Sequence, residues 1–429
     1  MPTGIDSSGN NSQPNSVLKA GQPPDAPGGR ATISPPSKQS WGADTGVQML
    51  SSNVDTLNLS INVVWKNEDF FACLSNLKQN AEAEGKDQPG LFKIPSSEKE
   101  FLFNIKGHGA KGYEWILDNN EYLLNIGNWQ EPKSMPSVMV YIRSETLWRQ
   151  GPKQAVKDII EFLASQNGYI KTVKLSRIDL CVDTLFPVNL WNRDLFDYRV
   201  TRATYASIHF NLNALTGITF GKGAISARLY DKHLEIQQQS KKTWMFDVWG
   251  HQQPPEGKKI IRIEFQLRRE TIKELGLDQY NDLFRLQKNL WKYCTQEWLK
   301  FQNNPGLKSQ QRKTFPWWEE IQNGFEGSQD AMPLIRCKAI SKDQDQLFCQ
   351  TNGLLTSMAA LIQERDFLEF GSVVTLSDQM KHFIEYAKGK RISEADITKS
   401  VQDKRARYRR SEEKIRAARA KRKEIGLLK

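Results

Sequence analysis

A phenol surrounded by charged side chains is the first feature of this sequence that could do chemistry. The stretch from Ser226 to Glu235 reads SARLYDKHLE and places Tyr230 between Arg228 and Lys232. Because side chains alternate along a β-strand, these three groups would share one side of an extended chain. A tyrosine in this company can be a nucleophile, a surface anchor or an ordinary strand residue, and the stretch alone leaves all three open.

Two further stretches, SRIDLCVD from Ser176 and IIRIEFQLR from Ile260, have the same pattern of one apolar and one polar side. The pattern predicts three strands whose polar sides merge into one surface if the strands pair in a single sheet. That surface would carry Arg177, Asp179, Cys181 and Asp183, then Ser226, Arg228, Tyr230 and Lys232, and finally Arg262, Glu264, Gln266 and Arg268. The alternative is an antiparallel sheet with one solvated face, which is very common.

The carboxylates of these strands indicate where a metal ion could bind. Asp179 and Asp183 lie four residues apart, about 13 Å along a strand, so they cannot share one ion unless the strand ends between them. Asp179 and Glu264 could share one if their strands are adjacent, since neighbouring strands lie about 4.8 Å apart. Oxygen ligands of this kind suit Mg²⁺ or Mn²⁺ rather than zinc. The five histidines form no close pair, so a histidine-built metal site on one strand is excluded, and His209 or His233 could assist only singly.

In three stretches and in their order, the chain resembles the replication initiation factor family, often called the Rep_trans group. The stretches read SRIDLCVD, TFGKGAISARLYDKHLE and RIEFQLRRE, and they follow an early VDTLNLSI strand. This family includes rolling-circle plasmid initiators, relaxases of integrative conjugative elements and initiators of filamentous phages. The resemblance covers roughly residues 54–275. It implies that a tyrosine nicks single-stranded DNA with the help of a divalent metal ion, Mg²⁺ or Mn²⁺.

The resemblance also implies roles for individual residues. Tyr230 would be the nucleophile, with Arg228 and Lys232 as catalytic cations beside it. The acidic candidates for the metal ion are Asp179, Asp183 and Glu264.

The expected reaction transfers a DNA phosphate to the phenol. Ionising a free tyrosine at pH 7 costs about 4 kcal/mol, because its pKa lies near 10. Neighbouring cations oppose that cost or hold the phosphate, and a divalent ion would polarise the phosphoryl oxygen. The products would be a 5′-phosphotyrosine and a free 3′ hydroxyl, so the predicted function is a rolling-circle replication initiator. The alternatives are a conjugative relaxase, a non-catalytic DNA-binding regulator of the same fold, and a metal nuclease that uses water.

Positive charge is concentrated at the C-terminal end of the chain. The formal net charge is +11, and residues 388–429 carry sixteen Lys and Arg against six Asp and Glu. A basic tail on a nearly neutral body indicates a polyanion partner, although a solvated basic helix is the alternative. The expected DNA contacts are Arg177, Arg262, Arg268, Arg405, Arg409 and Arg416. The expected partner is origin DNA in a single-stranded or extruded form; a host helicase, a polymerase and a second copy of the chain in a homodimer are further candidates.

Composition divides the chain into four parts. We expect a disordered tail over 1–53, a nicking domain over 54–275, a helical domain over 276–387 and a basic helical tail over 388–429. The expected fold class is α+β, with a mostly antiparallel central sheet, flanking helices and a helical C-terminal region. The chain has no apolar run long enough to cross a membrane, and its five scattered cysteines include no CxxC pair. These features predict a cytoplasmic, reduced protein.

Overall fold

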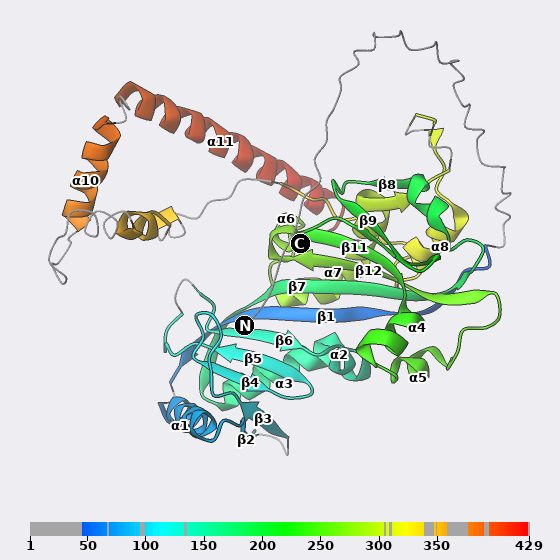
Figure 1. Ribbon diagram of the computed structural model, residues 1–429. Helices are drawn as coiled ribbons and strands as arrows, with labels where there is room; N and C mark the ends of the chain where they lie inside the picture. The colour runs from blue at the N-terminus through cyan, green and yellow to red at the C-terminus, as the bar shows by residue number, and fades with distance from the viewer. Residues whose placement is uncertain are drawn as a thin grey trace, which may run out of the picture. The chain divides into compact units, whose positions relative to one another are not determined.

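An eleven-stranded antiparallel sheet dominates the computed structural model (Figure 1). The strands are ordered β2-β3-β4-β5-β6-β1-β7-β12-β11-β10-β9 across the sheet. Their bounds are β1 Gln48–Trp65, β2 Gln88–Lys93, β3 Glu100–Ile105, β4 Trp115–Asp118, β5 Tyr122–Ile126, β6 Val138–Ile142, β7 Gly168–Pro187, β9 Ala206–Asn211, β10 Ala214–Phe220, β11 Ile225–Asp231 and β12 Lys258–Arg268. A separate two-stranded sheet pairs β8 (Arg199–Thr201) with β13 (Leu299–Phe301).

The structure describes most of the chain after residue 44. The described residues are 45–66, 68–94, 99–132, 135–303, 306–308, 311–338, 347–348, 350–357, 376–389 and 394–427. All of them belong to one compact unit.

Period-two patterns in the sequence account for the long central strands. In β1, the side chains of Leu57, Leu59, Ile61 and Val63 are fully buried, as their alternation with polar residues predicts. The apolar sides of β7, β11 and β12 are buried in the same way, for example at Leu180, Leu229 and Phe265. The expected α+β class with a mostly antiparallel sheet is confirmed.

Helices form where the sequence has both helical spacing of its apolar residues and signals for the ends of a helix. Those before the last strand of the large sheet are α1 Glu68–Glu84, α2 Ser144–Gln150, α3 Pro152–Ser165, the 3₁₀ helix η1 Arg193–Tyr198, α4 Lys232–Glu235, the π-helical η2 Ile236–Ser240 and α5 Met245–Trp249. Those after it are α6 Arg269–Glu274, α7 Tyr280–Lys292, the π-helical η3 Tyr293–Trp298, α8 Pro316–Asn323, α10 Leu376–Gly389 and α11 Glu394–Glu424. The expected helix after Pro152 is confirmed, with proline in its first turn, where a missing N–H costs nothing.

Two of the predicted boundaries are wrong. The sheet begins before residue 54, because Ser51, Ser52 and Asn53 already pair with β7. The backbone ladder holds these short polar residues in the sheet, which their composition does not reveal. Residues 1–44 of the predicted disordered tail lie outside the described residues.

The second wrong boundary is at residue 276, because the following helices complete the hydrophobic core of the sheet. The ring of Trp291 on α7 stands edge-on to Phe265 of β12, with centroids 5.4 Å apart. Trp317 on α8 meets Phe186 of β7 at the same centroid distance. Residues from α7 to α8 therefore fold with the sheet instead of forming a separate helical domain.

The C-terminal segment is helical, as expected. The end of α11 is attached to the body through Arg422, whose guanidinium donates to the carbonyl oxygens of Glu274 and Ile335 at 2.7 and 2.6 Å. Across the described ranges, no helix is both long and apolar enough to pass through a membrane.

Candidate active site

The strand register brings the three polar sides together on one face of the sheet. Arg262 of β12 lies opposite Asp183 of β7 and Tyr230 of β11, and Glu264 lies opposite Arg228. Directly paired residues point to the same face, so the predicted common surface is confirmed. It is not the solvated face of the alternative interpretation, because five of its groups are at most 4 % exposed: Asp179, Cys181, Asp183, Arg262 and Glu264.

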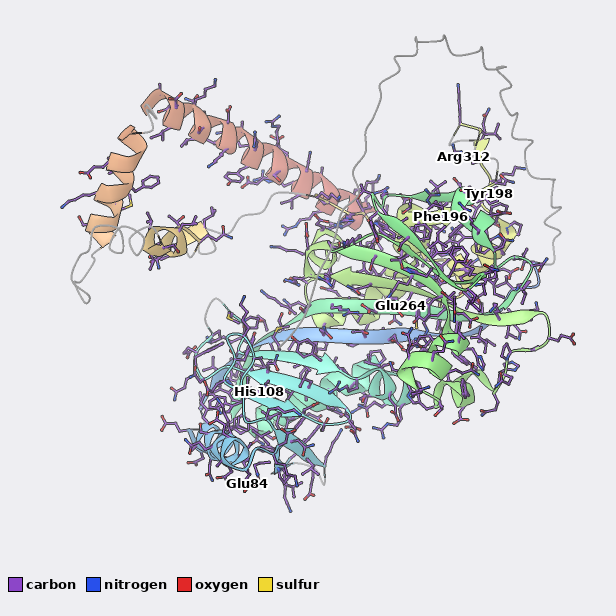
Figure 2. All side chains as sticks on the ribbon, in the orientation of Figure 1. Glu84, His108, Phe196, Tyr198, Glu264 and Arg312 are labelled. Atoms are coloured by element: carbon purple, nitrogen blue, oxygen red, sulfur yellow. The ribbon has the colours of Figure 1, made fainter. Side chains whose placement is uncertain are left out.

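The phenol of Tyr230 contacts a carboxylate on the neighbouring strand (Figure 2 labels Glu264). Its hydroxyl donates to Oε2 of Glu264 at 3.0 Å, and Arg228 forms an ion pair with Oε1 of the same carboxylate. Arg228 Nη2 also lies 3.9 Å from Asp179 Oδ2. Arg177 donates to the two oxygens of Asp179 from Nε and Nη2 at 2.9 and 2.5 Å. A continuous network of opposite charges therefore leads from Arg177 to the phenol.

Burial governs the protonation of the phenol. It raises the pKa of Tyr230 well above 10, the charge of Glu264 raises it further, and the charge of Arg262 lowers it only in part. The hydroxyl is therefore protonated at neutral pH and acts as a hydrogen-bond donor. An attack by this oxygen needs a base that removes the proton during the reaction, and Glu264 is the acceptor in contact with it.

The carboxyl group of Asp179 predicts a dependence of stability on pH. Burial raises its pKa to about 6, although the hydrogen bonds from Arg177 oppose this. As the pH rises, the Asp179 carboxyl loses its proton near pH 4 in the unfolded chain but only near pH 6 in the folded protein. The stability that protonated Asp179 contributes is therefore fully present below about pH 4 and is lost as the pH rises through about 6. Relative to an Asp179→Asn variant, we expect the free energy of unfolding to fall by about 3 kcal/mol between about pH 4 and pH 7. Urea denaturation at each pH measures this, and parallel pH profiles of the two proteins would contradict it.

A second cluster, centred on the buried side chains of Arg262 and Asp183, lies on the same face of the sheet. Arg262 donates from Nε and Nη2 to the two oxygens of Asp183 at 2.6 and 2.8 Å, and from Nη1 to Asp55 at 2.9 Å. The indole N–H groups of Trp249 and Trp148 donate to Asp183 and Asp55, each at 2.9 Å. Burial works to raise the pKa of Asp55, but the charge of Arg262 and the bond from Trp148 help to lower it well below its usual range.

This cluster corrects two predicted roles. Asp183 is not available to a metal ion, because both of its oxygens accept hydrogen bonds and the residue is 0 % exposed. Arg262 is not available to DNA, because its guanidinium is buried against two carboxylates. Sequence reasoning missed Asp55, whose only signal is an acidic residue inside the predicted VDTLNLSI strand.

Lys232 approaches the phenol from a helix and not from the strand. β11 ends at Asp231, whose side chain accepts the backbone N–H of Leu234 and so begins α4. Lys232 is 3 % exposed, donates to Glu235 at 2.5 Å, and has its Nζ 5.7 Å from the ring centroid of Tyr230. Burial, followed by the charge of Arg262, lowers its pKa. The expected neighbour of the phenol is therefore present, but its ammonium is bound to a carboxylate.

The other predicted DNA contacts remain accessible. Arg268 lies opposite Arg177 in the β7–β12 ladder, so two guanidinium groups stand at one end of the polar face. Arg268 is exposed, and about a third of the surface of the Arg177 side chain is exposed as well. The three remaining contacts are exposed on α11: Arg405, Arg409 and Arg416.

The three predicted metal ligands do not converge. Asp183 belongs to the buried cluster, while Asp179 and Glu264 share the guanidinium of Arg228. Within the part of the chain that the structure describes, no three His, Cys, Asp or Glu side chains form a group that could hold a metal ion. This arrangement does not fit a divalent ion, because arginines already pair with both carboxylates: Arg177 with Asp179, and Arg228 with Glu264.

A cavity of about 480 Å³ near the β9 edge of the sheet has Tyr230 in its wall. Tyr230 and Arg228, which are both partly exposed, form one part of its wall. The wall also includes residues of β9, β10, α4 and η2, namely His209, Gly217, Thr219, Glu235, Gln238 and Gln239. Sequence reasoning singled out none of the β10 residues, because a glycine and a threonine in a strand carry no signal of a site.

Comparison with known proteins adds no family assignment. No model of a protein family matches this chain, and no curated protein matches it. The resemblance to the Rep_trans group therefore stays a prediction from the quoted motifs, and the geometry of the site has to support the function.

Proposed function

We propose that this chain nicks and rejoins one strand of DNA as a rolling-circle replication initiator, with Tyr230 as the nucleophile. The observation that supports this most is the 3.0 Å hydrogen bond from the phenol to Glu264, at a cavity that reaches Tyr230 and Arg228. A tyrosine kept for packing needs no buried carboxylate at its hydroxyl, because burying charged groups is costly. A tyrosine that must lose its proton and attack an anion needs both a base and a cation.

The contacts of Tyr230 suggest how the reaction proceeds. The phenolic oxygen attacks the phosphorus of a DNA phosphodiester while Glu264 takes the phenolic proton. The bond from phosphorus to the 3′ oxygen breaks, which leaves a 5′-phosphotyrosine and a 3′ end. Transfer of the proton during the attack avoids a free phenolate, which would cost more than about 4 kcal/mol at pH 7 because the pKa of Tyr230 is raised.

Arg228 has two roles in this proposal. On the cavity wall, its guanidinium can bind the non-bridging oxygens of the phosphate and stabilise the charge that develops on them. When it exchanges Glu264 for the phosphate, Glu264 loses its cation and becomes a stronger base. Binding of the substrate thereby prepares the base that the attack requires.

The phosphotyrosine keeps the energy of the broken bond, so a 3′ hydroxyl can later attack it and rejoin the strand. The freed 3′ end can also prime synthesis, which fits origin DNA as the partner and a host polymerase and helicase as further ones. Mg²⁺ or Mn²⁺ stays a prediction of the family resemblance, because Arg177 binds both oxygens of Asp179 and Arg228 pairs with Glu264. No step above depends on the ion.

A supercoiled plasmid that carries the chain's own origin separates this function from its alternatives. A nick with the protein linked to the 5′ end supports the initiator. A metal-dependent nick without a link would favour a nuclease that uses water, and specific binding without a nick would favour a regulator. Nicking at a transfer origin and not at a replication origin would indicate a conjugative relaxase.

The exposed arginines of α11 should bind DNA phosphates. We expect simultaneous replacement of Arg405, Arg409 and Arg416 by alanine to weaken binding of single-stranded DNA. The slope of log K against log salt should become shallower by about 2, since each lost phosphate contact removes about 0.7. Fluorescence anisotropy over a series of KCl concentrations measures both quantities.

A matched control removes three positive charges elsewhere. Lys86, Lys153 and Lys157 are exposed and lie near or on α1 and α3. Their replacement by alanine should leave the slope nearly unchanged. Equal slopes for the two triple variants would show that α11 makes no special contact with DNA.

A further inference from the structure

The outer strands of the sheet place a histidine across the cavity from Tyr230. In the ladders of β9, β10 and β11, Gly217 is paired with His209 on one side and with Tyr230 on the other. The next row pairs Thr219 with Ser207 and Arg228 in the same way. Paired residues share a face, so His209 and Tyr230 stand on the same face of the sheet, two strands apart.

Gly217 leaves the space between these two side chains open. A Cβ atom at this position would lie 3.2 Å from the Cβ of Tyr230 and from the carbonyl oxygen of Leu229. Any side chain on this strand position would therefore crowd the tyrosine. Neighbouring strands are about 4.8 Å apart, so the backbones of β9 and β11 are separated by about 10 Å at this row. The cavity lined by His209, Gly217 and Tyr230 lies at this gap, which is wide enough for a phosphoryl group.

His209 is exposed and is positioned by two hydroxyl groups. Its Nε2 lies 3.2 Å from Ser207 Oγ and 3.2 Å from Thr219 Oγ1. Nδ1 has no hydrogen-bond partner among the residues that the structure describes, so it is the nitrogen left for a substrate. The ring lines the same cavity as Tyr230 and Arg228.

We propose that His209 is the general acid of the nicking reaction and protonates the leaving 3′ oxygen; this rests on the proposed function. In an in-line displacement, the attacking and leaving oxygens lie on opposite sides of phosphorus. As the bond from the Tyr230 oxygen to phosphorus forms, the bond to the 3′ oxygen breaks. The phenolic proton passes to Glu264, and the imidazolium of His209 gives its proton to the 3′ oxygen. In the rejoining step, the neutral imidazole takes that proton back.

A sulfur leaving group tests the role directly. Two oligonucleotides carry the nick site mapped with the unchanged protein, one with the natural 3′ oxygen and one with sulfur at that position. A thiolate leaves without being protonated, so the sulfur substrate needs no general acid. We expect His209→Ala to slow single-turnover nicking of the oxygen substrate by about 10²–10⁴-fold and nicking of the sulfur substrate by less than about threefold.

Two further variants keep the result interpretable. His209→Gln can retain a hydrogen bond to Ser207 or Thr219 but cannot supply the proton, so it should show the same rescue by sulfur. His108→Ala removes an exposed histidine far from Glu264 (Figure 2) and should nick both substrates at the normal rate. Equal slowing of both substrates in the His209 variants, or no slowing of the oxygen substrate, would overturn the role of His209 and leave the proposed function intact. If the unchanged protein forms no linked product with either substrate, the proposed function fails and this inference fails with it.

Discussion

Replacement of Tyr230 by phenylalanine should abolish the covalent link between the protein and the 5′ end of the nicked strand. The change removes the one oxygen that donates to Glu264 and leaves the ring in place. Because no other group takes over a lost nucleophile efficiently, nicking should fall on the order of 10⁴-fold or more. A 5′-labelled downstream fragment that comigrates with the protein in a denaturing gel measures the link.

The same variant should keep its fold and its affinity for DNA. Loss of one hydrogen bond to a charged acceptor costs about 1.5–3 kcal/mol, and phosphate contacts are untouched. Tyr205→Phe is the matched control, because Tyr205 is 45 % exposed and lies against Lys222 instead of a carboxylate. A Tyr230→Phe protein that still forms the link would exclude Tyr230 as the nucleophile and direct attention to the other tyrosines.

Replacement of Arg262 by alanine should destabilise the protein more than removal of any other charged side chain of the polar face. The variant would leave Asp183, which is 0 % exposed, without the guanidinium that binds both of its oxygens, and Asp55 would lose the same partner. Breaking a buried ion pair by removing one partner costs about 3–5 kcal/mol. The midpoint of urea denaturation should therefore move sharply downward.

Arg268→Ala provides the contrast on the same strand. Arg268 is exposed at the end of β12, so its removal should change the free energy of unfolding by no more than about 0.5 kcal/mol. The effects on DNA affinity should be the reverse. Arg268→Ala should bind DNA more weakly, whereas the folded fraction of Arg262→Ala should bind it as the unchanged protein does. An Arg262→Ala protein of normal stability with weak DNA binding would restore the role that the sequence predicted for this residue.

Strand periodicity explains why the polar face could be predicted. The side of a strand on which a residue lies depends only on the local backbone, so Tyr230, Glu264 and Asp179 could be placed on polar sides without knowledge of the fold. The motif order then predicted that their strands belong together. Neither argument predicts the register of the strands, which pairs Tyr230 with Arg262 and Glu264 with Arg228.

The fates of Asp179 and Asp183 show where sequence reasoning ends. Both are acidic, lie on the same side of β7 and have similar neighbours in the sequence. Asp179 bonds to Arg177, a residue on its own strand, whereas Asp183 lies beneath Trp249 and is held by Arg262. The difference arises because the segment that ends in α5 packs back over one end of the face, where Leu185, Ile260 and Met245 form a hydrophobic cluster.

Local pattern was thus sufficient for the strands and their polar sides, because these follow from the period of the backbone and the types of nearby residues. The choice of Tyr230 rests on the resemblance to the Rep_trans group and stays a prediction. Local pattern was not sufficient for the partners of each charged group. Whether an arginine meets DNA or a buried carboxylate depends on which distant segment covers it, and packing between residues far apart in the chain decides that. Asp55, Gly217 and His209 acquire their neighbours in the same way, from strands that meet only in the folded sheet.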